Sequence, residues 1–278
     1  MTLVASGFVL VVASASLGAR LGPSQPCPAT GFSCERTSVV DPGTWYPLCV
    51  GTRWTYRNTN AMATGNNGVV ETRWISSEEV VSRTPCTGGL VVRIDVTPSN
   101  IERDYPAGLA ADSRTWFEKN VAVPSSKGYL VRGSAMYPFT PTSWGEPCRS
   151  VNPERLREID GSQAEFYFPL EDGAMWSDRE REEQDYAAIC AAYRGEGQFP
   201  NPGFYYWRVE DREDIDVPWH NALAAWHMAY FAVGGAPHRW FVRHVGIVKE
   251  RFSHNGSLWE TSSALLSFRT GPRCGGGE

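Results

Sequence analysis

The stretch PLCVGTRW (residues 47–54) decides the fold, because its frame, Pro-Leu-x-x-Gly-x-x-Trp, returns as PLEDGAMW at residues 169–176. Proline fixes φ and lacks an N–H donor, so it belongs just before a strand or at its edge. Leucine then anchors the approach, glycine permits a turn or bulge, and tryptophan enters the core as the first large strand residue. The two frames therefore predict two similar half-sheets, whose entry positions are Pro47, Leu48, Gly51 and Trp54, and then Pro169, Leu170, Gly173 and Trp176.

Short runs with strand chemistry follow the first frame. In LVVRIDV (residues 90–96), Leu90, Val92 and Ile94 point one way while Arg93 and Asp95 point the other, which is the period of a half-buried strand. Gly, Pro, Ser and Asn separate the runs at hairpin-like intervals. The N-terminal half is expected to be an antiparallel meander, with strands at RWTYRN, VVETRWIS, LVVRIDV, RTWFEKN and GYLVRGS.

The C-terminal half repeats this pattern after one interruption. SDREREEQDYAAICAAYRG (residues 177–195) begins with a capping box at Ser177 and Glu180 and continues into an Ala-rich run, which predicts a helix at about 178–194. ALAAWHMAYFAV (222–233) is apolar on both faces, so it is expected to be a central strand. HNG (254–256) predicts a tight hairpin turn between the last two strands.

The expected fold is mainly β, because no long parallel β-α-β alternation appears. It is a curved antiparallel sheet or half-barrel of two similar halves, with one helix and an extended leader that carries disulfides. The expected organisation is a signal peptide at 1–19, an extended leader at 20–44, one β domain at 45–270 with halves 45–160 and 164–270, and a tail at 271–278.

The N-terminus and the cysteines indicate export. Residues 1–19 carry no charge and offer small-x-small sites such as Ala13-Ser14-Ala15, which favours a secretory signal over an uncleaved membrane anchor. Seven scattered cysteines without a C-x-x-C favour disulfides in an oxidising compartment, and Cys27 with Cys34 is the nearest local pair. We expect an exported protein that is periplasmic, in the cell envelope or extracellular, and not an integral membrane protein.

Charge and missing motifs exclude several function classes. The net charge is -5 and the basic residues are dispersed, so nucleic acid and anionic membrane surfaces are not expected partners. The sequence has no Gly-x-Ser-x-Gly, no Gly-x-Gly-x-x-Gly and no phosphate loop, which removes the usual entry points for serine hydrolases, dinucleotide enzymes and NTPases. No cofactor and no catalytic residue is expected.

Four histidines are the weak candidates for a metal site. His220, His227, His238 and His244 fall within 25 residues, which supplies enough imidazole if the strands converge. Their spacings are not those of metal ligands, and no His-Glu-x-x-His occurs. Isolated histidines are therefore the expected arrangement.

Several motifs resemble uncharacterised exported bacterial proteins and lipoproteins of the TapB-like and DUF3108-like kind. They are WYPLCVGTRWTY, FYFPLEDGAMW, VEDREDIDVP with AAWHMAYF, and RWFVRHVGIVKERFSHNGSLWETSSALLSF, with Gly246 and Lys249 in the Val-Gly-x-Val-Lys hairpin. The resemblance covers about residues 45–268; VPWHNA lacks the family's glycine, and the Cys27/Cys34 leader is extra. It implies a curved antiparallel sheet related to the half-barrels of lipoprotein carriers, with a helix or loops across the concave side and no established catalytic residues.

Three functions stay open at this stage. The first is a non-enzymatic exported protein that binds a lipid or other apolar small molecule in a β groove, which fails if side chains fill the concave side. The second is a structural or interaction protein of the cell envelope with a solid core and an exposed aromatic patch. The third is a hydrolase built on a histidine or carboxylate cluster.

Overall fold

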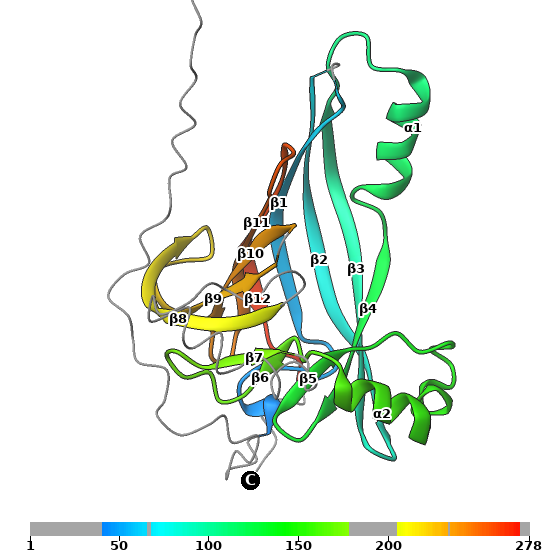
Figure 1. The fold of residues 1–278 in the computed structure, drawn as a ribbon, viewed down its shortest axis with the longest axis vertical. Helices are drawn as coiled ribbons and strands as arrows, with labels where there is room; N and C mark the ends of the chain where they lie inside the picture. Colours follow the sequence, from blue (N-terminus) through cyan, green and yellow to red (C-terminus); the bar gives the residue numbers. More distant parts are fainter. Residues whose placement is uncertain (1–40, 66–67, 178–204, 233, 273–278) are drawn as a thin grey trace, which may run out of the picture.

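The structure, a computed structural model, describes residues 41–65, 68–177, 205–232 and 234–272. Figure 1 shows long strands that form one curved sheet, with two short α-helices at its margins. The elements are η1 (Pro42–Thr44), β1 (Arg53–Ala63), β2 (Val69–Cys86), β3 (Gly89–Asp104), α1 (Ala111–Asn120), β4 (Ser125–Arg132), β5 (Ala135–Pro138), η3 (Pro147–Ser150), α2 (Pro153–Gly161), β6 (Phe166–Tyr167), β7 (Met175–Ser177), β8 (Tyr206–Val217), β9 (His220–Phe231), β10 (Gly235–Val242), β11 (Gly246–His254) and β12 (Trp259–Arg269).

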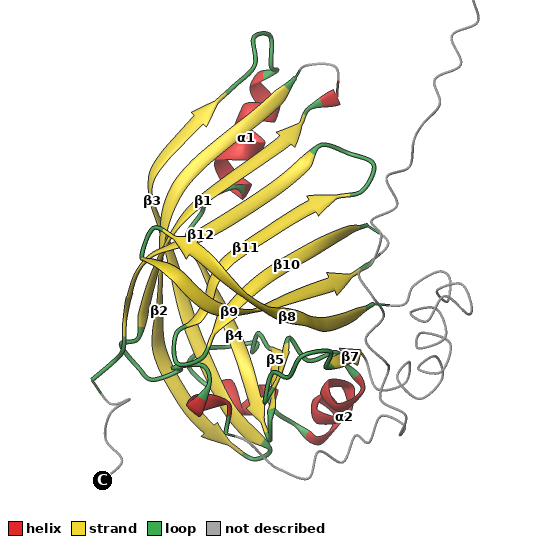
Figure 2. Cartoon of the chain, turned by 90° about the vertical axis from the view of Figure 1, so that its left-hand side faces the viewer, coloured by secondary structure: helices red, strands yellow, loops and turns green. Residues whose placement is uncertain are grey.

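The strands form one antiparallel sheet of 12 strands in the order β6-β5-β4-β3-β2-β1-β12-β11-β10-β9-β8-β7. Strands that follow one another in the chain are neighbours, except that β1 pairs with β12 at the centre while β6 and β7 stand at the two edges. Figure 2 shows the strands curling around one concave side. The predicted mainly β half-barrel is confirmed. From here on, the first half of the sheet means β1–β6 with the chain up to residue 168, and the second half means β7–β12 with the chain from residue 169, which differs from the predicted boundary between residues 160 and 164.

The central strand β1 shows which face of the sheet is concave. Trp54, Tyr56, Asn58 and Asn60 alternate along it and are buried, whereas Arg57 between them is exposed. Successive side chains of a strand point to opposite faces, so this buried series marks the concave face of the whole sheet through the backbone register. Pairing with β2 and β12 extends the face to Ser76 and Leu265, as the alternating pattern predicts.

Aromatic rings fill the end of the concave side where the two frames lie. Tyr46, Trp54, Phe166, Phe168 and Phe241 are fully buried, and the neighbouring ring centroids among them are 5.4 to 5.9 Å apart. Such separations are typical of packed aromatic pairs. Because Phe241 comes from the second half and the others from the first, this aromatic floor joins the two halves.

One predicted strand is wrong, since RTWFEKN lies in helix α1. Its Phe117 packs with Val70 and Leu109 on the concave face near the tips of β1–β3. Asp112 in the first turn and Lys119 in the last turn complement the helix dipole. These end charges are signals for a helix and are independent of a period-two alternation. The packing of Phe117 on Val70, which places α1 on the sheet, joins residues that are far apart in the sequence.

Helix α2 occupies part of the stretch that interrupts the strand pattern before the second frame. Asn152 caps it by accepting a hydrogen bond of 2.8 Å from the Arg155 N–H, and Pro153 occupies the first turn. Ile159 and Leu156 pack against Val91, which lies on the convex side of β3. The helices α1 and α2 therefore lie on opposite faces of the sheet, and the helix predicted at 178–194 lies outside the described residues.

The last hairpin and one disulfide complete the fold. β11 and β12 are paired as predicted, and residues 255–258 connect them, with Gly256 at a φ of +88°. Cys86 and Cys148 form a disulfide that ties the end of β2 to η3. Cys49 is also disulfide-bonded. The predicted pair Cys27–Cys34 lies outside the described residues.

Candidate functional site

The two frames have the same local geometry. Gly51 and Gly173 have φ values of +87° and +78°, and each donates its N–H at 2.8 Å to a carbonyl of the next paired strand, Val80 and Val209 respectively. Each glycine lies at the third position of a four-residue turn that requires a positive φ. Leu48 and Leu170 precede these turns, and each is only 2% exposed.

The two frame tryptophans also play matching parts. The indole of Trp54 donates a hydrogen bond of 2.6 Å to the Val245 carbonyl, and the indole of Trp176 donates one of 2.9 Å to the Ala164 carbonyl. Trp54 thereby joins β1 to the β10–β11 turn, whereas Trp176 joins edge strand β7 to the segment before β6. The frame residues are thus part of the packing, and none of these contacts leaves a group exposed for chemistry.

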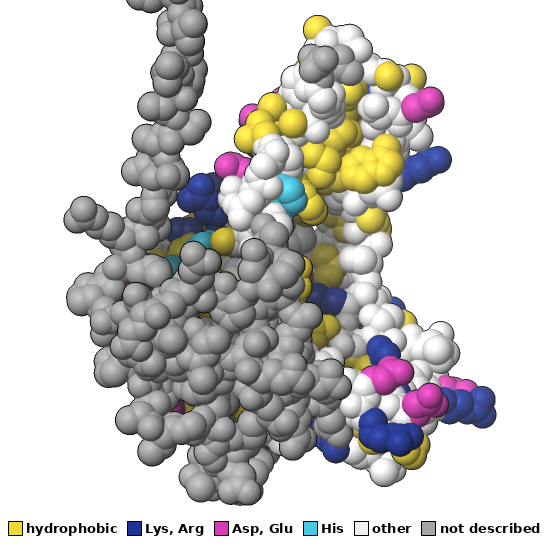
Figure 3. Space-filling model, viewed as in Figure 1, with side chains coloured by type: hydrophobic (Ala, Val, Ile, Leu, Met, Phe, Trp, Pro, Cys, Tyr) yellow, Lys and Arg dark blue, Asp and Glu magenta, His cyan; other side chains and the backbone are white. Residues whose placement is uncertain are grey.

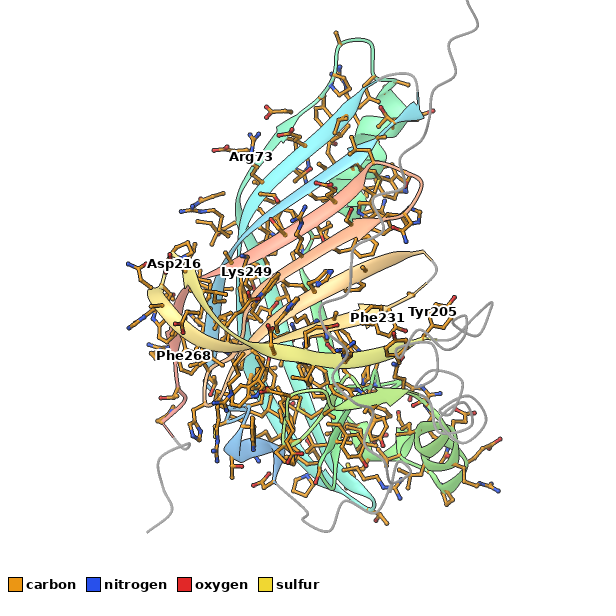
Figure 4. The ribbon with its side chains drawn as sticks, turned by 60° about the vertical axis from the view of Figure 1, so that its left-hand side comes forward. Arg73, Tyr205, Asp216, Phe231, Lys249 and Phe268 are labelled. Atoms are coloured by element: carbon orange, nitrogen blue, oxygen red, sulfur yellow. A yellow bond between two sulfur atoms is a disulfide. The ribbon has the colours of Figure 1, made fainter. Side chains whose placement is uncertain are left out.

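Gly246 and Lys249, which the family resemblance singles out, lie at different depths. Gly246 has a φ of +103°, and a Cβ atom there would lie 1.9 Å from a ring carbon of Tyr46. Lys249 points to the convex side, where its ammonium lies 4.6 Å from the centroid of the Trp240 ring (Figure 4). The glycine is required by a close approach of an aromatic ring, and the lysine makes a cation–π contact.

The structure brings two of the four candidate histidines together. His227 Nε2 and His238 Nδ1 are 2.9 Å apart on neighbouring strands, and the His227 ring stacks on Trp240. His220 lies at the start of β9, and His244 lies in the turn between β10 and β11. Among the described residues, no group of three or more His, Cys, Asp or Glu side chains is arranged to hold a metal ion.

A cavity of about 450 Å³ opens on the concave side beside the aromatic floor. Its wall combines β4 and the chain around β5 from the first half with β10 and β11 from the second, and Arg155 of α2 reaches its rim. Figure 3 shows hydrophobic side chains on the upper part of the hollow beneath α1, with a basic side chain lower down. This cavity is the candidate functional site.

Two ion pairs dominate the cavity wall. Lys127 Nζ lies 2.6 Å from Glu78 Oε2, and Arg239 Nη1 lies 2.7 Å from Glu165 Oε1. Glu250 approaches Arg239 Nε at 3.4 Å from the same strand pair. Lys127 keeps 37% of its side chain accessible because it faces the cavity, whereas Arg239 keeps 15%.

The protonation states of three wall groups are fixed. Burial acts to lower the pKa of Lys127, but its interactions with Glu78, Tyr46 and Glu165 together outweigh burial and raise that pKa. The pKa of Arg239 is likewise raised, since attraction to Glu250 and Glu165 outweighs burial. Burial raises the pKa of the Tyr129 hydroxyl, which donates a hydrogen bond of 3.2 Å to Glu165. These two cations and this neutral phenol therefore persist throughout the neutral pH range.

An apolar surface adjoins the cavity along the same face. Met62 pairs with Trp259, whose ring lies 5.1 Å from that of Phe252, and we call these three residues the strand-tip patch. Trp259 is 37% exposed. Phe252 is two residues from Glu250 on β11, so the patch begins about 7 Å along the strand from the charged wall.

The sequence pattern does not reveal the charged residues of the cavity wall or Glu78, the partner of Lys127. Glu78, Lys127, Glu165, Arg239 and Glu250 come from five separate segments, and only the sheet register and the curl bring them together. One signal was available, because Glu78 stands two residues before Val80 and so occupies the apolar face of an alternating strand.

Comparison with known proteins adds two loose structural likenesses. No protein-family model matches the chain, and no curated protein matches it, so the TapB-like or DUF3108-like resemblance stays a prediction. Two of the solved structures that match are a presumed lipoprotein of Parabacteroides distasonis (14% identity, TM-score 0.33) and a presumed exported protein with a YmcC-like fold from Bacteroides fragilis (13% identity, TM-score 0.34). Each comparison covers 81% of this chain and 99% of the other. At these TM-scores the likenesses carry no argument about function.

The helices provide one further finding. None of the helices among the described residues is long and apolar enough to cross a membrane.

Proposed function

We propose that this chain is an exported, non-enzymatic binding protein that holds one amphipathic ligand on the concave side of its sheet. The cavity of about 450 Å³ between the two halves carries the proposal, because small-molecule sites commonly enclose roughly 300–1,000 Å³. The ligand's polar group would enter the cavity, and its apolar part would lie along the strand-tip patch. This refines the apolar ligand expected from the sequence by adding a polar end.

Binding fits the wall chemistry better than catalysis does. A general acid or base works best when its pKa lies near the working pH, whereas Lys127, Arg239 and Tyr129 keep one protonation state there. The solid-core alternative requires a filled concave side. The aromatic floor fills the frame end and the cluster under α1 fills the strand tips, whereas the cavity lies open beside the floor. Export is supported by the Cys86–Cys148 disulfide, which suits an oxidising compartment.

The first test is native mass spectrometry of the full chain produced in an oxidising host, followed by solvent extraction of any bound molecule. We expect a co-purifying amphiphile. In parallel, dodecylphosphocholine below its micelle concentration is titrated into the protein and followed by tryptophan fluorescence, because Trp259 lies in the patch. A bare mass together with no saturable response to any single-chain amphiphile would overturn the proposal.

A pair of neighbouring substitutions locates the apolar part of the ligand. Phe252→Gln removes a ring from the strand-tip patch, whereas Ser253→Gln places the same side chain on the opposite face of β11. Removing a buried phenyl contact costs about 1.5–3 kcal/mol, which weakens binding roughly 10-fold to 100-fold. The Ser253→Gln variant keeps the wild-type affinity. Equal affinities for both variants would place the ligand elsewhere.

A further inference from the structure

The cavity wall presents both signs of charge, and each half of the sheet contributes to both. Lys127 and Glu165 come from the first half, and Arg239 and Glu250 come from the second. Glu78 is held against Lys127, so the cations of the wall are matched by carboxylates. A ligand that enters the cavity therefore meets donors and acceptors within the same small volume.

Arg239 lines the cavity between two carboxylates, Glu165 and Glu250. Its Nε and Nη1 atoms are buried and make no hydrogen bond of acceptable geometry, although carboxylate oxygens lie 3.4 and 2.7 Å from them. The guanidinium also lies 4.7 Å from the Trp207 ring centroid, which holds its plane in place. Carboxylates already face these two atoms, so a ligand oxygen would meet the positive charge of Arg239 at the 15% of its side chain that stays accessible on the cavity wall.

Glu250 is the acceptor that suits the opposite end of such a ligand. Its side chain is 35% exposed, more than twice the 16% of Glu165, and it lines the cavity one strand step from Phe252. A carboxylate offers about four lone-pair sites, and Arg239 Nε lies 3.4 Å from only one of the two Glu250 oxygens. An ammonium group that enters the cavity would therefore find an acceptor here.

We infer that the cavity selects a zwitterionic head group, with its phosphate or carboxylate at Arg239 and Lys127 and its ammonium at Glu250. This inference rests on the proposed function and specifies the chemical class of its ligand. A purely anionic head would approach Glu165 and Glu250 without compensation, and a purely cationic head would approach Lys127 and Arg239. Such like-charge contacts reject the wrong ligands at a binding site.

The test compares four amphiphiles that share one dodecyl chain, each below its micelle concentration and bound to the full chain. They are dodecylphosphocholine, dodecyl phosphate, dodecyltrimethylammonium and dodecyl maltoside, with affinities measured by isothermal titration calorimetry. The zwitterion is expected to bind at least about 10-fold more tightly than each of the others, the ratio that one well-placed charge interaction of about 1.4 kcal/mol gives.

A matched pair of charge-neutral variants assigns the ammonium site. Glu250→Gln keeps the shape but removes the carboxylate, so affinity for dodecylphosphocholine falls about 10-fold while affinity for dodecyl phosphate rises. Glu260→Gln changes net charge equally at an exposed position of β12, and it leaves all affinities unchanged. Urea unfolding of both variants confirms that each is folded.

The outcomes separate the head-group inference from the proposed function. Equal binding of all four amphiphiles would overturn the inference and leave the binding function standing. Tightest binding of the anion, the cation or the maltoside would also overturn it, by naming another head-group class. Binding of none would remove the proposed function and the inference together.

Discussion

The two frames share their turn and their tryptophan but lead to strands of very different length and position in the sheet. The first opens β1, which has 11 residues and lies at the centre of the sheet between β2 and β12. The second opens β7, which has three residues and lies at the edge. The same local sequence therefore determines how each strand begins, whereas the rest of the chain determines how long that strand is and where it lies in the sheet.

The two frames also differ in which part of the molecule they contact. The two residues just before the first frame reach into the opposite half, because Tyr46 packs on Gly246 and the Trp45 carbonyl accepts a hydrogen bond of 2.8 Å from the His244 N–H. The second frame reaches across the open seam, where Trp176 bonds to the Ala164 carbonyl. The first therefore fastens the centre of the sheet, and the second fastens its two edges to each other.

The largest expected loss of stability comes from Gly246→Ala, which disrupts the contact between Gly246 and Tyr46 beside the first frame. The added methyl group would meet the Tyr46 ring, and alanine would be strained at a φ of +103°. Positive φ costs about 1–2 kcal/mol and overpacking about 1–3 kcal/mol, so we expect a loss of about 4 kcal/mol in the free energy of unfolding, measured with urea. Gly256→Ala, at +88° with nothing within 4 Å, is the control and loses only about 1–2 kcal/mol. Similar losses for the two variants would show that the Tyr46 ring moves aside at little cost in free energy.

A slightly smaller effect tests the disulfide that ties down the first half. Cys86 and Cys148 are 62 residues apart, and the chain-entropy view gives at most about 4 kcal/mol of stabilisation for a loop of that length. The double variant Cys86→Ser/Cys148→Ser should lose about that much stability in urea unfolding. Hydrogen exchange should locate the loosening at the β2–β3 end. A loss below about 1 kcal/mol would mean that the packing of α2 already holds this end.

The third prediction compares the frames directly through Trp54→Phe and Trp176→Phe. Each removes an indole donor and leaves a buried carbonyl without its partner, which costs about 1–3 kcal/mol. We expect about 3 kcal/mol for Trp54 and about 1 kcal/mol for Trp176, because a short edge strand can relax where a central one cannot. Urea unfolding gives the totals. Hydrogen exchange should rise around β6 and β7 in the Trp176 variant, and equal losses would contradict the distinction drawn between centre and edge.

The frames also show what could be predicted from the sequence. Turn chemistry and strand entry are local, so spacing alone singles out Gly51, Gly173 and the two frame tryptophans. The half-barrel followed from alternation over many strands. RTWFEKN was assigned to a strand because the contact between Phe117 and Val70 that places α1 on the sheet is not local.

The candidate site was beyond sequence reasoning for a related reason. Arg239 and Glu165 are 74 residues apart and meet only because the sheet curls, and no spacing rule covers that. His227 and His238 are 11 residues apart in the sequence, and only the register of β9 and β10 brings His227 Nε2 to 2.9 Å from His238 Nδ1. Long-range register and curvature, rather than composition, built both clusters.

The smallest expected effect is a pH dependence of stability in the second half, which contains all five histidines of the chain. Burial lowers the pKa of His238, and the nearby His227 and Arg251 lower it further, while Glu213 opposes them. The folded state therefore binds fewer protons than the unfolded chain between the lowered pKa and the ordinary value of about 6.5. Stability consequently falls as the pH drops from about 7 through this window, and it stops falling on this account below the folded pKa.

His238→Gln removes this dependence, so its difference in the free energy of unfolding from the wild type should shrink or reverse between pH 7.5 and pH 5. We expect a change below about 1 kcal/mol, because the imidazole is only half-buried. His220→Gln, at the exposed start of β9, is the matched control and should leave the wild-type pH dependence intact. If His238→Gln instead kept the wild-type slope, the acid sensitivity of the second half would have to come from another group. The His227–His238 pair would then not be the reason for a difference in acid sensitivity between the two halves.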